Sequence, residues 1–431
     1  MNFKSMTLYS EFVPKQRRSI KRDLGLLCSL KGFFTPKTID DLEELGLFPP
    51  RIKVNKKEFF FSKQGKEALR RISDFISQSK KYSDFLNYND IFKEVILEIE
   101  RWINDDIVPN DLEFIEPLDK IFSKKVDDYT FVCKVDGLSL DGVNNIIIGN
   151  KEIKKYDQQI IADLTDDLTT AIAEEYTNSI IISGSERGSR SVAQEKFYHN
   201  AELSLSVLRL YSCALYSSAI YQANILLIND CGNSYGRASS FGWRNDDKSL
   251  SFTRYLKSKQ DFEIGRDLIE SFKSDYFFTE LISVIGKKNK NELENAVSKS
   301  LFWIGEAQKE RSHASVWVKL WSCVECFFVF GEEKVTERNS QGLASILVFG
   351  GYDHDQFSDY NDLKTKIKKF YGLRSKIVHH AEYTQIDEVL LEELSFMVAW
   401  LIITMVSLLD RGYTMLSDIQ EQAERLDKIQ N

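Results

Sequence analysis

Hydrophobic positions recur with a helical period through much of this chain. One such pattern spans residues 68–76 and a second spans residues 91–103. Five more predicted helices follow one another near the C-terminus, over residues 292–310, 314–330, 338–349, 360–378 and 386–409. All six prolines lie within the first 117 residues, so no proline interrupts this later series.

A different pattern occupies the middle of the chain. Residues 130–135 and 145–148 form short β-branched and aromatic runs separated by a turn-rich segment, which predicts a small antiparallel sheet. Further strands are expected over 223–227 and 249–255. Helices are expected over 158–176 and 192–217, with a polar loop at 183–189 between them, and a linker is expected between Pro109 and Pro117.

These patterns predict an α+β fold that is predominantly α. We expect a mainly helical region over 1–117, an α+β region over 118–285 with a sensing or regulatory role, and an all-α helical bundle over 286–431. The apolar run at 396–409 is shorter than a membrane helix requires and contains Thr404 and Ser407, so we expect it to be a core or subunit-interface helix and expect no membrane partner.

Composition narrows the functional class. The 431 residues carry a net charge of −8, which disfavours a protein that coats nucleic acid over its whole surface but permits a local basic site. The six cysteines are few and irregularly spaced, and the first 22 residues carry charges where a signal peptide would need an apolar core. We therefore expect a cytoplasmic protein.

Several possible site motifs have simpler interpretations. The segment from Gly184 to Gly188 lacks the ending of a phosphate-binding loop, so a solvated loop is expected. Cys323 and Cys326 have metal-ligand spacing but no second pair of ligands, so we expect them to pack as small hydrophobes and expect neither metal nor cofactor. The isolated histidines are expected to be surface or hydrogen-bonded residues; they are His199, His313 and His354.

The strongest chemical candidate is the stretch Phe-Tyr-Gly-Leu-Arg-Ser-Lys-Ile-Val-His-His at 370–380. A permanently charged guanidinium at Arg374 and a histidine that titrates near neutrality are residue types that handle phosphate. On an ideal helix, however, Arg374 lies about 140° from His379 and about 120° from His380. A solvated helix end is therefore the alternative to a catalytic pair.

Glu325 is unusual because it lies inside the apolar stretch 316–328. A carboxylate there is either exposed on a polar stripe or buried with a cationic partner. From the pattern alone, the exposed arrangement is the one we expect.

The Arg-Ser-x-x-x-His form, preceded by Phe-Tyr-x-Leu and followed by a polar turn and a long apolar helix, resembles the Arg-x4-6-His signature of the HEPN superfamily, in particular its Apea-like branch. The upstream segment 322–328, Ser-Cys-Val-Glu-Cys-Phe-Phe, is similar to a second element of that branch. The resemblance covers residues 290–425. It implies a helical bundle that forms a homodimer, with the two Arg/His motifs facing each other across a cleft.

Many such domains are metal-independent endoribonucleases, and many act in prokaryotic antiviral defence or as toxins. The resemblance implies catalytic roles for Arg374 and His379 and an orienting role for Glu325 on Arg374. Ser375 occupies a position where many members carry Asn. His380 stands where Apea-like members frequently have Gly, so the identity of the histidine that enters the cleft stays open.

We therefore predict a dimeric HEPN ribonuclease that cleaves RNA, with tRNA as one candidate, in abortive infection after a phage-derived or cellular trigger. Basic residues near the motif are candidates for binding the RNA backbone; they are Lys364, Lys368, Lys369 and Lys376. Two alternatives stay open. One is a non-catalytic HEPN module that binds RNA or a nucleotide and acts through a partner. The other is a structural dimerisation protein in which Arg374 only pairs with Glu325.

Overall fold

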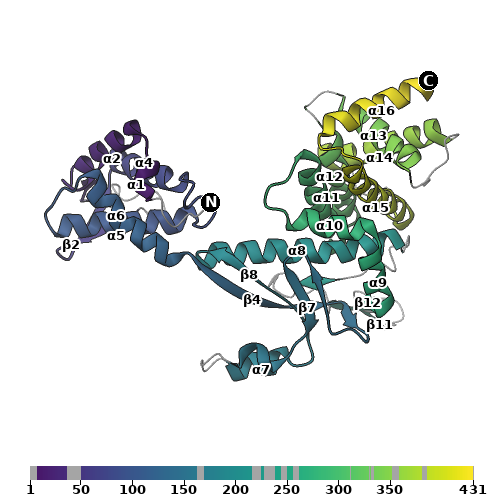
Figure 1. Cartoon of the computed structure of the whole chain (residues 1–431), viewed down its shortest axis with the longest axis horizontal. Helices are drawn as coiled ribbons and strands as arrows, with labels where there is room; N and C mark the ends of the chain where they lie inside the picture. The colour runs from purple at the N-terminus through teal and green to yellow at the C-terminus, as the bar shows by residue number, and fades with distance from the viewer. Residues whose placement is uncertain are drawn as a thin grey trace. The chain divides into compact units, whose positions relative to one another are not determined.

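The computed structural model describes residues 7–35, 50–162, 169–215, 225–227, 238–243, 250–255, 262–310, 312–329, 331, 334–351, 359–380 and 386–430. The fold is α+β and predominantly α, as predicted (Figure 1). The chain divides into two compact units, each described by itself below. Unit 1 consists of Met1–Phe131 and Ser185–Phe197, and unit 2 of Val132–Gly184 and Tyr198–Asn431. The three-part division stays a prediction.

Unit 1 combines helices with a small three-stranded sheet. Its helices are α1 (Leu8–Glu11), α2 (Pro14–Leu27), α4 (Lys63–Ser77), α5 (Tyr88–Asn104) and α6 (Asp111–Lys125). The strands β1 (Phe33–Phe34), β2 (Arg51–Val54) and β3 (Lys57–Phe61) pair antiparallel in the order β1-β3-β2. The apolar faces predicted for the α4 and α5 segments are buried in one hydrophobic core.

Helix α6 corrects the predicted linker between Pro109 and Pro117. Asn110 caps its N-terminus by accepting a hydrogen bond from the amide of Glu113, whose side chain in turn accepts one from the amide of Asn110. Pro117 lies inside the helix, which buries Phe114 and Leu118 in the core of unit 1. The apolar burial and the strong N-cap offset the backbone hydrogen bond that proline cannot make.

Unit 2 contains a five-stranded sheet of order β6-β7-β8-β4-β9. Its strands are β4 (Asp127–Asp136), β6 (Asn145–Ile148), β7 (Lys151–Lys155), β8 (Ile180–Gly188) and β9 (Leu226–Leu227). The first residues of β4, through Phe131, and the last of β8, from Ser185, belong to unit 1. The strand β5 (Leu138–Leu140) pairs in parallel with β12 (Phe262–Ile264), and β10 (Ala238–Trp243) pairs antiparallel with β11 (Leu250–Tyr255). The sheet also has two helical neighbours in sequence, η2 (Gln158–Ile161) and α7 (Thr169–Tyr176).

Strand β8 corrects the predicted polar loop at 183–189. Its residues Ile180 to Ser183 pair antiparallel with β7, and the strand continues to Gly188. A Cβ atom on Gly184 would lie 2.7 Å from Cδ of Lys151 and 3.0 Å from the carbonyl oxygen of Asn150. Glycine is therefore needed here by close packing within a strand, not by a turn.

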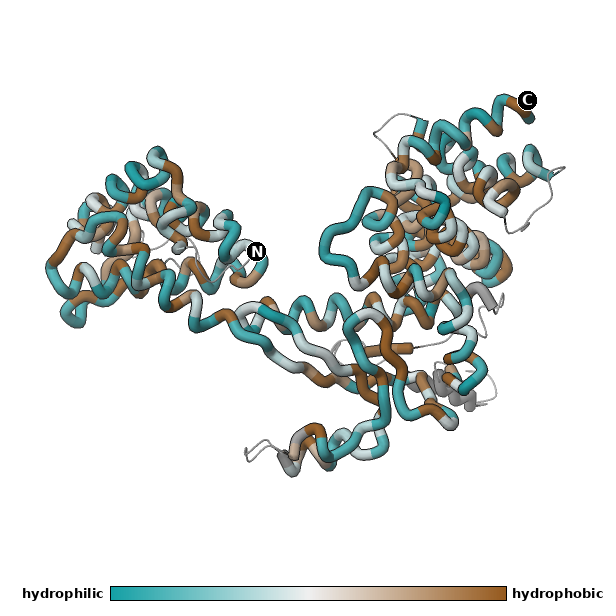
Figure 2. The backbone as a smooth tube through the Cα atoms, viewed as in Figure 1, coloured by the Kyte–Doolittle hydropathy of each residue, from teal (hydrophilic) through white to brown (hydrophobic). Residues whose placement is uncertain are grey.

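Helices form the rest of unit 2. They are α8 (Arg190–Leu215, of which the first residues belong to unit 1), α9 (Arg266–Ser274), α10 (Tyr276–Gly286), α11 (Glu292–Lys309), α12 (His313–Phe328), α13 (Val335–Phe349), α14 (Tyr360–His380), α15 (Glu388–Asp410) and α16 (Leu416–Gln430). Figure 2 shows hydrophobic and hydrophilic residues alternating along these helices, as expected where one face is buried.

Helix α15 is the central core helix of this bundle. It is long and apolar enough to cross a membrane by composition, but 67% of its apolar window is buried inside the protein. It packs against α11, α12 and α13. The prediction of a core helix for the 396–409 run is confirmed.

Candidate functional site

The residues of the candidate motif all lie on one helix, α14, which continues through His380 instead of ending near residue 378. Two aromatic side chains anchor this helix to α12. Phe370 meets the buried Trp317 edge-on with ring centroids 5.2 Å apart, and Tyr371 meets the buried Trp321 in the same way at 5.0 Å. These contacts hold the motif-bearing helix against the helix that carries Glu325.

Arg374 is held by Glu325 across this helix pair. Its Nη2 atom lies 3.1 Å from Oε1 and 3.2 Å from Oε2 of the carboxylate. The two side chains are only 20% and 21% exposed. Glu325 is therefore largely buried with a cationic partner, and the exposed arrangement expected from the apolar pattern is wrong.

Tyr371 completes the support of this ion pair. Its hydroxyl donates a hydrogen bond to Oε1 of Glu325 over 3.0 Å, and the Arg374 guanidinium carbon lies 5.6 Å from the centroid of its ring. Burial, and next the negative charge of Glu325, raise the pKa of Tyr371 to about 12. The phenol therefore stays protonated and remains a donor at neutral pH. This role was not predicted from the sequence, although the position of Tyr371 three residues before Arg374 places both on one helix face.

The histidines lie on a different face of α14. His379 and His380 are both exposed in the last helical turn, and so is Lys376 one turn earlier. Ser375 is half-buried. The structure therefore keeps Arg374 and both histidines on one rigid helix but does not bring them together on one face of it.

The four candidate RNA-binding lysines differ in their surroundings. Lys364 is buried, with its Nζ atom 2.5 Å from Asp427 and 3.0 Å from Glu337. Asp427 lies on α16 and Glu337 on α13, so the two ion pairs hold these helices against α14. Lys364 is therefore not free to contact RNA, and its prediction as an RNA-binding residue is wrong. Lys368 is more exposed and pairs with Glu337 at 2.5 Å.

Lys369 and Lys376 are exposed and lie seven residues apart, on the same helix face as His379 and His380. Gly372 lies between them, and a Cβ atom built on it would meet nothing within 4 Å. The solvent-facing side of α14 is therefore a basic stripe that consists of Lys369, Lys376, His379 and His380.

Of the two cysteines with Cys-x-x-Cys spacing, Cys323 packs in the core as expected, whereas Cys326 is only half-buried. Cys323 is fully buried, and its Sγ lies 3.4 Å from the carbonyl oxygen of Ser300. Burial raises the pKa of both thiols, to about 11 for Cys326. Across the part of the chain that the structure describes, no group of three or more His, Cys, Asp and Glu side chains is placed to hold a metal ion. His354 lies outside the described residues.

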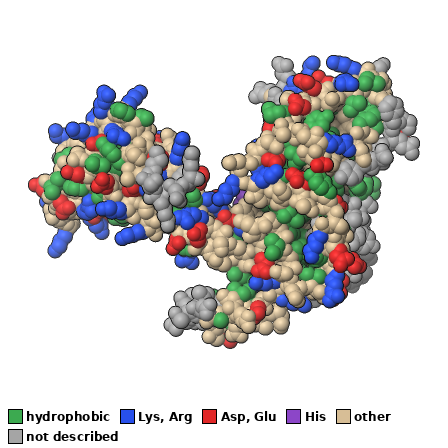
Figure 3. All heavy atoms as spheres, viewed as in Figure 1, with side chains coloured by type: hydrophobic (Ala, Val, Ile, Leu, Met, Phe, Trp, Pro, Cys, Tyr) green, Lys and Arg blue, Asp and Glu red, His purple; other side chains and the backbone are tan. Residues whose placement is uncertain are grey.

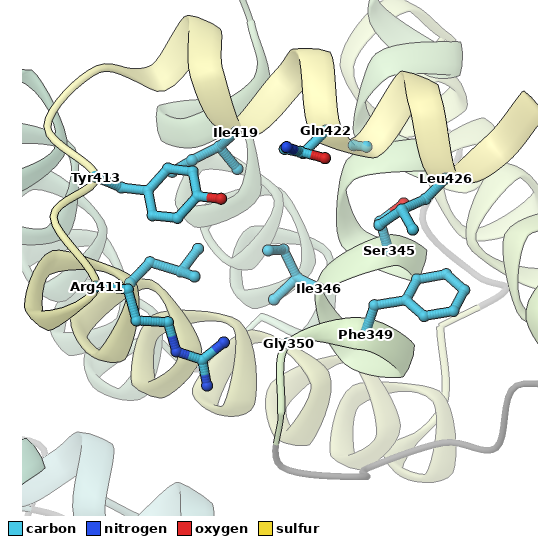
Figure 4. A pocket seen from close by; sticks show the side chains of 11 residues that line it. Ser345, Ile346, Phe349, Gly350, Arg411, Tyr413, Ile419, Gln422 and Leu426 are labelled. Atoms are coloured by element: carbon cyan, nitrogen blue, oxygen red, sulfur yellow. The ribbon is translucent and has the colours of Figure 1, made fainter.

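A cavity of about 230 Å³ lies away from the motif, between α13, the end of α15 and α16 (Figure 4). Its walls are mainly apolar, and Ser345, Arg411, Tyr413 and Gln422 add polar groups to the lining. None of the candidate motif residues lines it.

No protein-family model, curated protein or solved structure matches this chain.

Proposed function

We propose that the chain is a cytoplasmic, metal-independent endoribonuclease of HEPN type that acts as a homodimer through its C-terminal helices. The observation that carries this proposal is the arrangement on α14. A largely buried arginine is fixed by Glu325 and Tyr371, and two histidines and two lysines are exposed on the adjoining face. This arrangement combines a positioned cation with titratable groups that can reach a polyanion.

The chemistry assigns a role to each group. The RNA 2′-hydroxyl attacks the adjacent phosphorus, a base removes its proton, and an acid donates a proton to the departing 5′-oxygen. A histidine serves as either base or acid near neutral pH. The Arg374 guanidinium donates hydrogen bonds to the phosphorane oxygens as their charge develops, and Glu325 and Tyr371 hold it in place.

A second copy of the chain supplies what one helix lacks. His379 and His380 are about 100° apart around the helix, so we expect one of them from each chain to enter the cleft, whereas the reaction needs both an acid and a base. A two-fold axis beside the ends of two α14 helices would bring both histidines and both arginines to one cleft. Lys369 and Lys376 would then lie along the approach of the RNA backbone.

The direct test measures cleavage of labelled RNA by the full chain with excess chelator. The wild type should release fragments with 2′,3′-cyclic phosphate ends, and Arg374→Ala and His379→Ala should lower the rate by at least about 100-fold. His199→Ala removes an exposed histidine of the same unit and serves as the matched control. His380→Ala decides which histidine acts. Cleavage at the parental rate by both Arg374→Ala and His379→Ala would end the proposal.

A mixing experiment tests the shared cleft. Wild type and His379→Ala are combined in equal amounts and allowed to exchange subunits. If one cleft needs both histidines, only wild-type pairs are active and the rate falls to about one quarter of that of an all-wild-type sample. If each chain had an independent site, the mixed sample would keep about one half of the wild-type cleavage rate.

The Arg374–Glu325 pair also favours a second candidate, a structural dimerisation bundle. That candidate requires a stability loss in Arg374→Ala with no effect in any RNA assay. If the wild type binds RNA but never cleaves it, the third possibility, a non-catalytic module with a partner enzyme, is favoured.

The biological setting we propose is abortive infection, in which cleavage of RNA, with tRNA as one candidate, stops the growth of an infected cell after a phage-derived or cellular trigger. Induced expression of the wild type should then arrest bacterial growth, and His379→Ala should not. Equal growth arrest by both chains would contradict a toxin role for the nuclease.

A further inference from the structure

Unit 1 contains a basic β-hairpin that the proposed ribonuclease does not use. Unit 1 as a whole is nearly neutral, with 26 Lys and Arg against 24 Asp and Glu, but residues 51–58 of the hairpin contain four Lys and Arg against one Glu. Figure 3 shows Lys and Arg side chains spread over the visible surface of unit 1. From these charges and the geometry of the hairpin, we propose that unit 1 binds duplex DNA through the hairpin β2–β3 and the groove at its base.

The hairpin presents one charged face. Ile52 and Val54 of β2 are buried in the core, so the alternate residues Arg51 and Lys53 point to solvent, with side chains 56% and 68% exposed. Both lie within 4 Å of one carboxylate, that of Glu58 on β3. One acidic group cannot neutralise two cations, so the face keeps a positive surplus.

The tip adds two more lysines in an unfavourable backbone conformation. Asn55 and Lys56 form the two-residue connection between β2 and β3, with φ of 51° and 69°. This is the turn in which glycine is preferred at the second position. The chain instead carries Lys56 there and Lys57 beside it, both exposed. A lysine kept where glycine would fit better points to a use for its charge.

A groove continues the basic surface from the base of the hairpin. It begins at Pro50, which precedes β2, and has a volume of about 600 Å³. Lys66 and Arg70 of α4 line it together with Tyr88 and Phe92 of α5 and with Asp74, whose carboxylate lies 3.7 Å from Arg70. Lys63 is exposed on the same helix. It precedes Lys66 by three residues and Arg70 by seven, so all three side chains lie on one helix face.

The geometry favours duplex DNA over RNA. The major groove of B-DNA is wide enough to admit a two-stranded β-ribbon, whereas that of A-form RNA is too narrow for side chains to read. Single strands are bound by stacking on exposed aromatic rings. The aromatic residues of the hairpin are not exposed, because Phe59 packs against the core and Phe60 lies 6.5 Å from the ring of Phe34. The hairpin therefore offers charge without stacking platforms, and the two aromatic rings of the groove, Tyr88 and Phe92, are stacked on each other with centroids 5.8 Å apart.

The test measures fluorescence anisotropy of a labelled 24-base-pair DNA duplex with the full chain at increasing salt. Lys56→Gly with Lys57→Thr removes two positive charges while suiting the turn and strand. At 50 mM salt we expect about tenfold weaker binding, and a slope of log affinity against log salt that is smaller by about two. The melting temperature should not fall, which separates lost binding from lost folding.

Lys120→Ala removes an exposed lysine of α6 in the same unit and should leave binding unchanged. RNA cleavage by the same double variant is measured in parallel, so failure of the nuclease and failure of DNA binding are separable. Three competitors are added to displace the labelled DNA: single-stranded 2′-O-methyl RNA, duplex 2′-O-methyl RNA and polyglutamate. The 2′-O-methyl group removes the attacking hydroxyl, so the RNA competitors are not cleaved. The inference is overturned if any of them displaces the chain more readily than duplex DNA does. It is also overturned if the double variant binds DNA as the wild type does, or if Lys120→Ala weakens binding equally.

Discussion

The ion pair between Arg374 and Glu325 allows a quantitative prediction by a double-mutant cycle. The Nη2 atom of Arg374 lies 3.1 Å from the carboxylate, and each side chain is about one-fifth exposed. At an effective dielectric constant of 20, the Coulomb attraction at about this distance is roughly 5 kcal/mol. Desolvation of the two groups offsets much of it, and residual exposure weakens the rest.

We therefore expect a coupling energy of about 1–2 kcal/mol between the two side chains. Glu325→Ala alone should lower the free energy of unfolding by about 2–3 kcal/mol, because it leaves a largely buried guanidinium without its carboxylate. The double variant should lose clearly less than the sum of the single variants. Urea unfolding of the full chain at pH 7, followed by circular dichroism, gives all four values.

The control is Lys369→Ala, which removes an exposed charge from the same helix and should change stability by less than about 0.5 kcal/mol. Additive single effects, with no coupling, would refute the reasoning that Glu325 positions Arg374. A strong coupling together with unchanged RNA cleavage in Arg374→Ala would favour the structural alternative.

Two further predictions concern the C-terminal helices. Gly342→Ala should destabilise the protein by about 1–3 kcal/mol, because its Cβ would lie 2.4 Å from the ring of the buried Phe328. Gly372→Ala has open space around its Cβ and should stabilise the protein by up to about 1 kcal/mol. The urea midpoints of the two variants and the wild type measure both effects. Burial alone would raise the pKa of Asp427. The hydrogen bonds that its carboxylate accepts, the strongest of them from Lys364, outweigh this effect and hold the pKa below its usual value of 3.8. A depressed carboxyl pKa stabilises the fold above the unfolded-state pKa and loses that effect as pH falls, so Asp427→Asn should cost about 2 kcal/mol at pH 7 and progressively less below about pH 4; an equal cost at pH 7 and pH 3 would contradict this.

Helices with a clear apolar period were predictable from sequence. The patterns over 292–310 and 360–378 led to helices within two residues of the observed ends, because burial of one apolar face decides their formation. The failures have local physical causes. Pro117 suggests a break, yet a capping box and buried neighbours keep α6 intact. Gly184 suggests a turn, yet close packing against β7 explains it.

Helix α16 was not predicted, because its sequence is mostly polar. Its place depends on contacts that no local pattern reveals: Asp427 accepts hydrogen bonds from Tyr360, Lys364 and Gln341 on two other helices. The hydrophobic pattern missed the burial of Glu325 for the same reason, since its partner lies 49 residues away, whereas the family resemblance had implied that Glu325 orients Arg374. The candidate residues were predictable by type, whereas their burial and pairing depended on tertiary contacts.

The discontinuity of unit 1 has a consequence for synthesis of the protein on the ribosome. Residues 185–197 belong to unit 1, but they emerge only after 132–184, the first segment of unit 2. The hydrophobic core of unit 1 lies within residues 8–122 and is complete earlier. During synthesis, the core of unit 1 can therefore form before residues 185–197 of that unit have left the ribosome. At that stage the first strands of unit 2 have already emerged. The segment 185–197 joins last, and within it the Ser189 hydroxyl donates a hydrogen bond to Asp90.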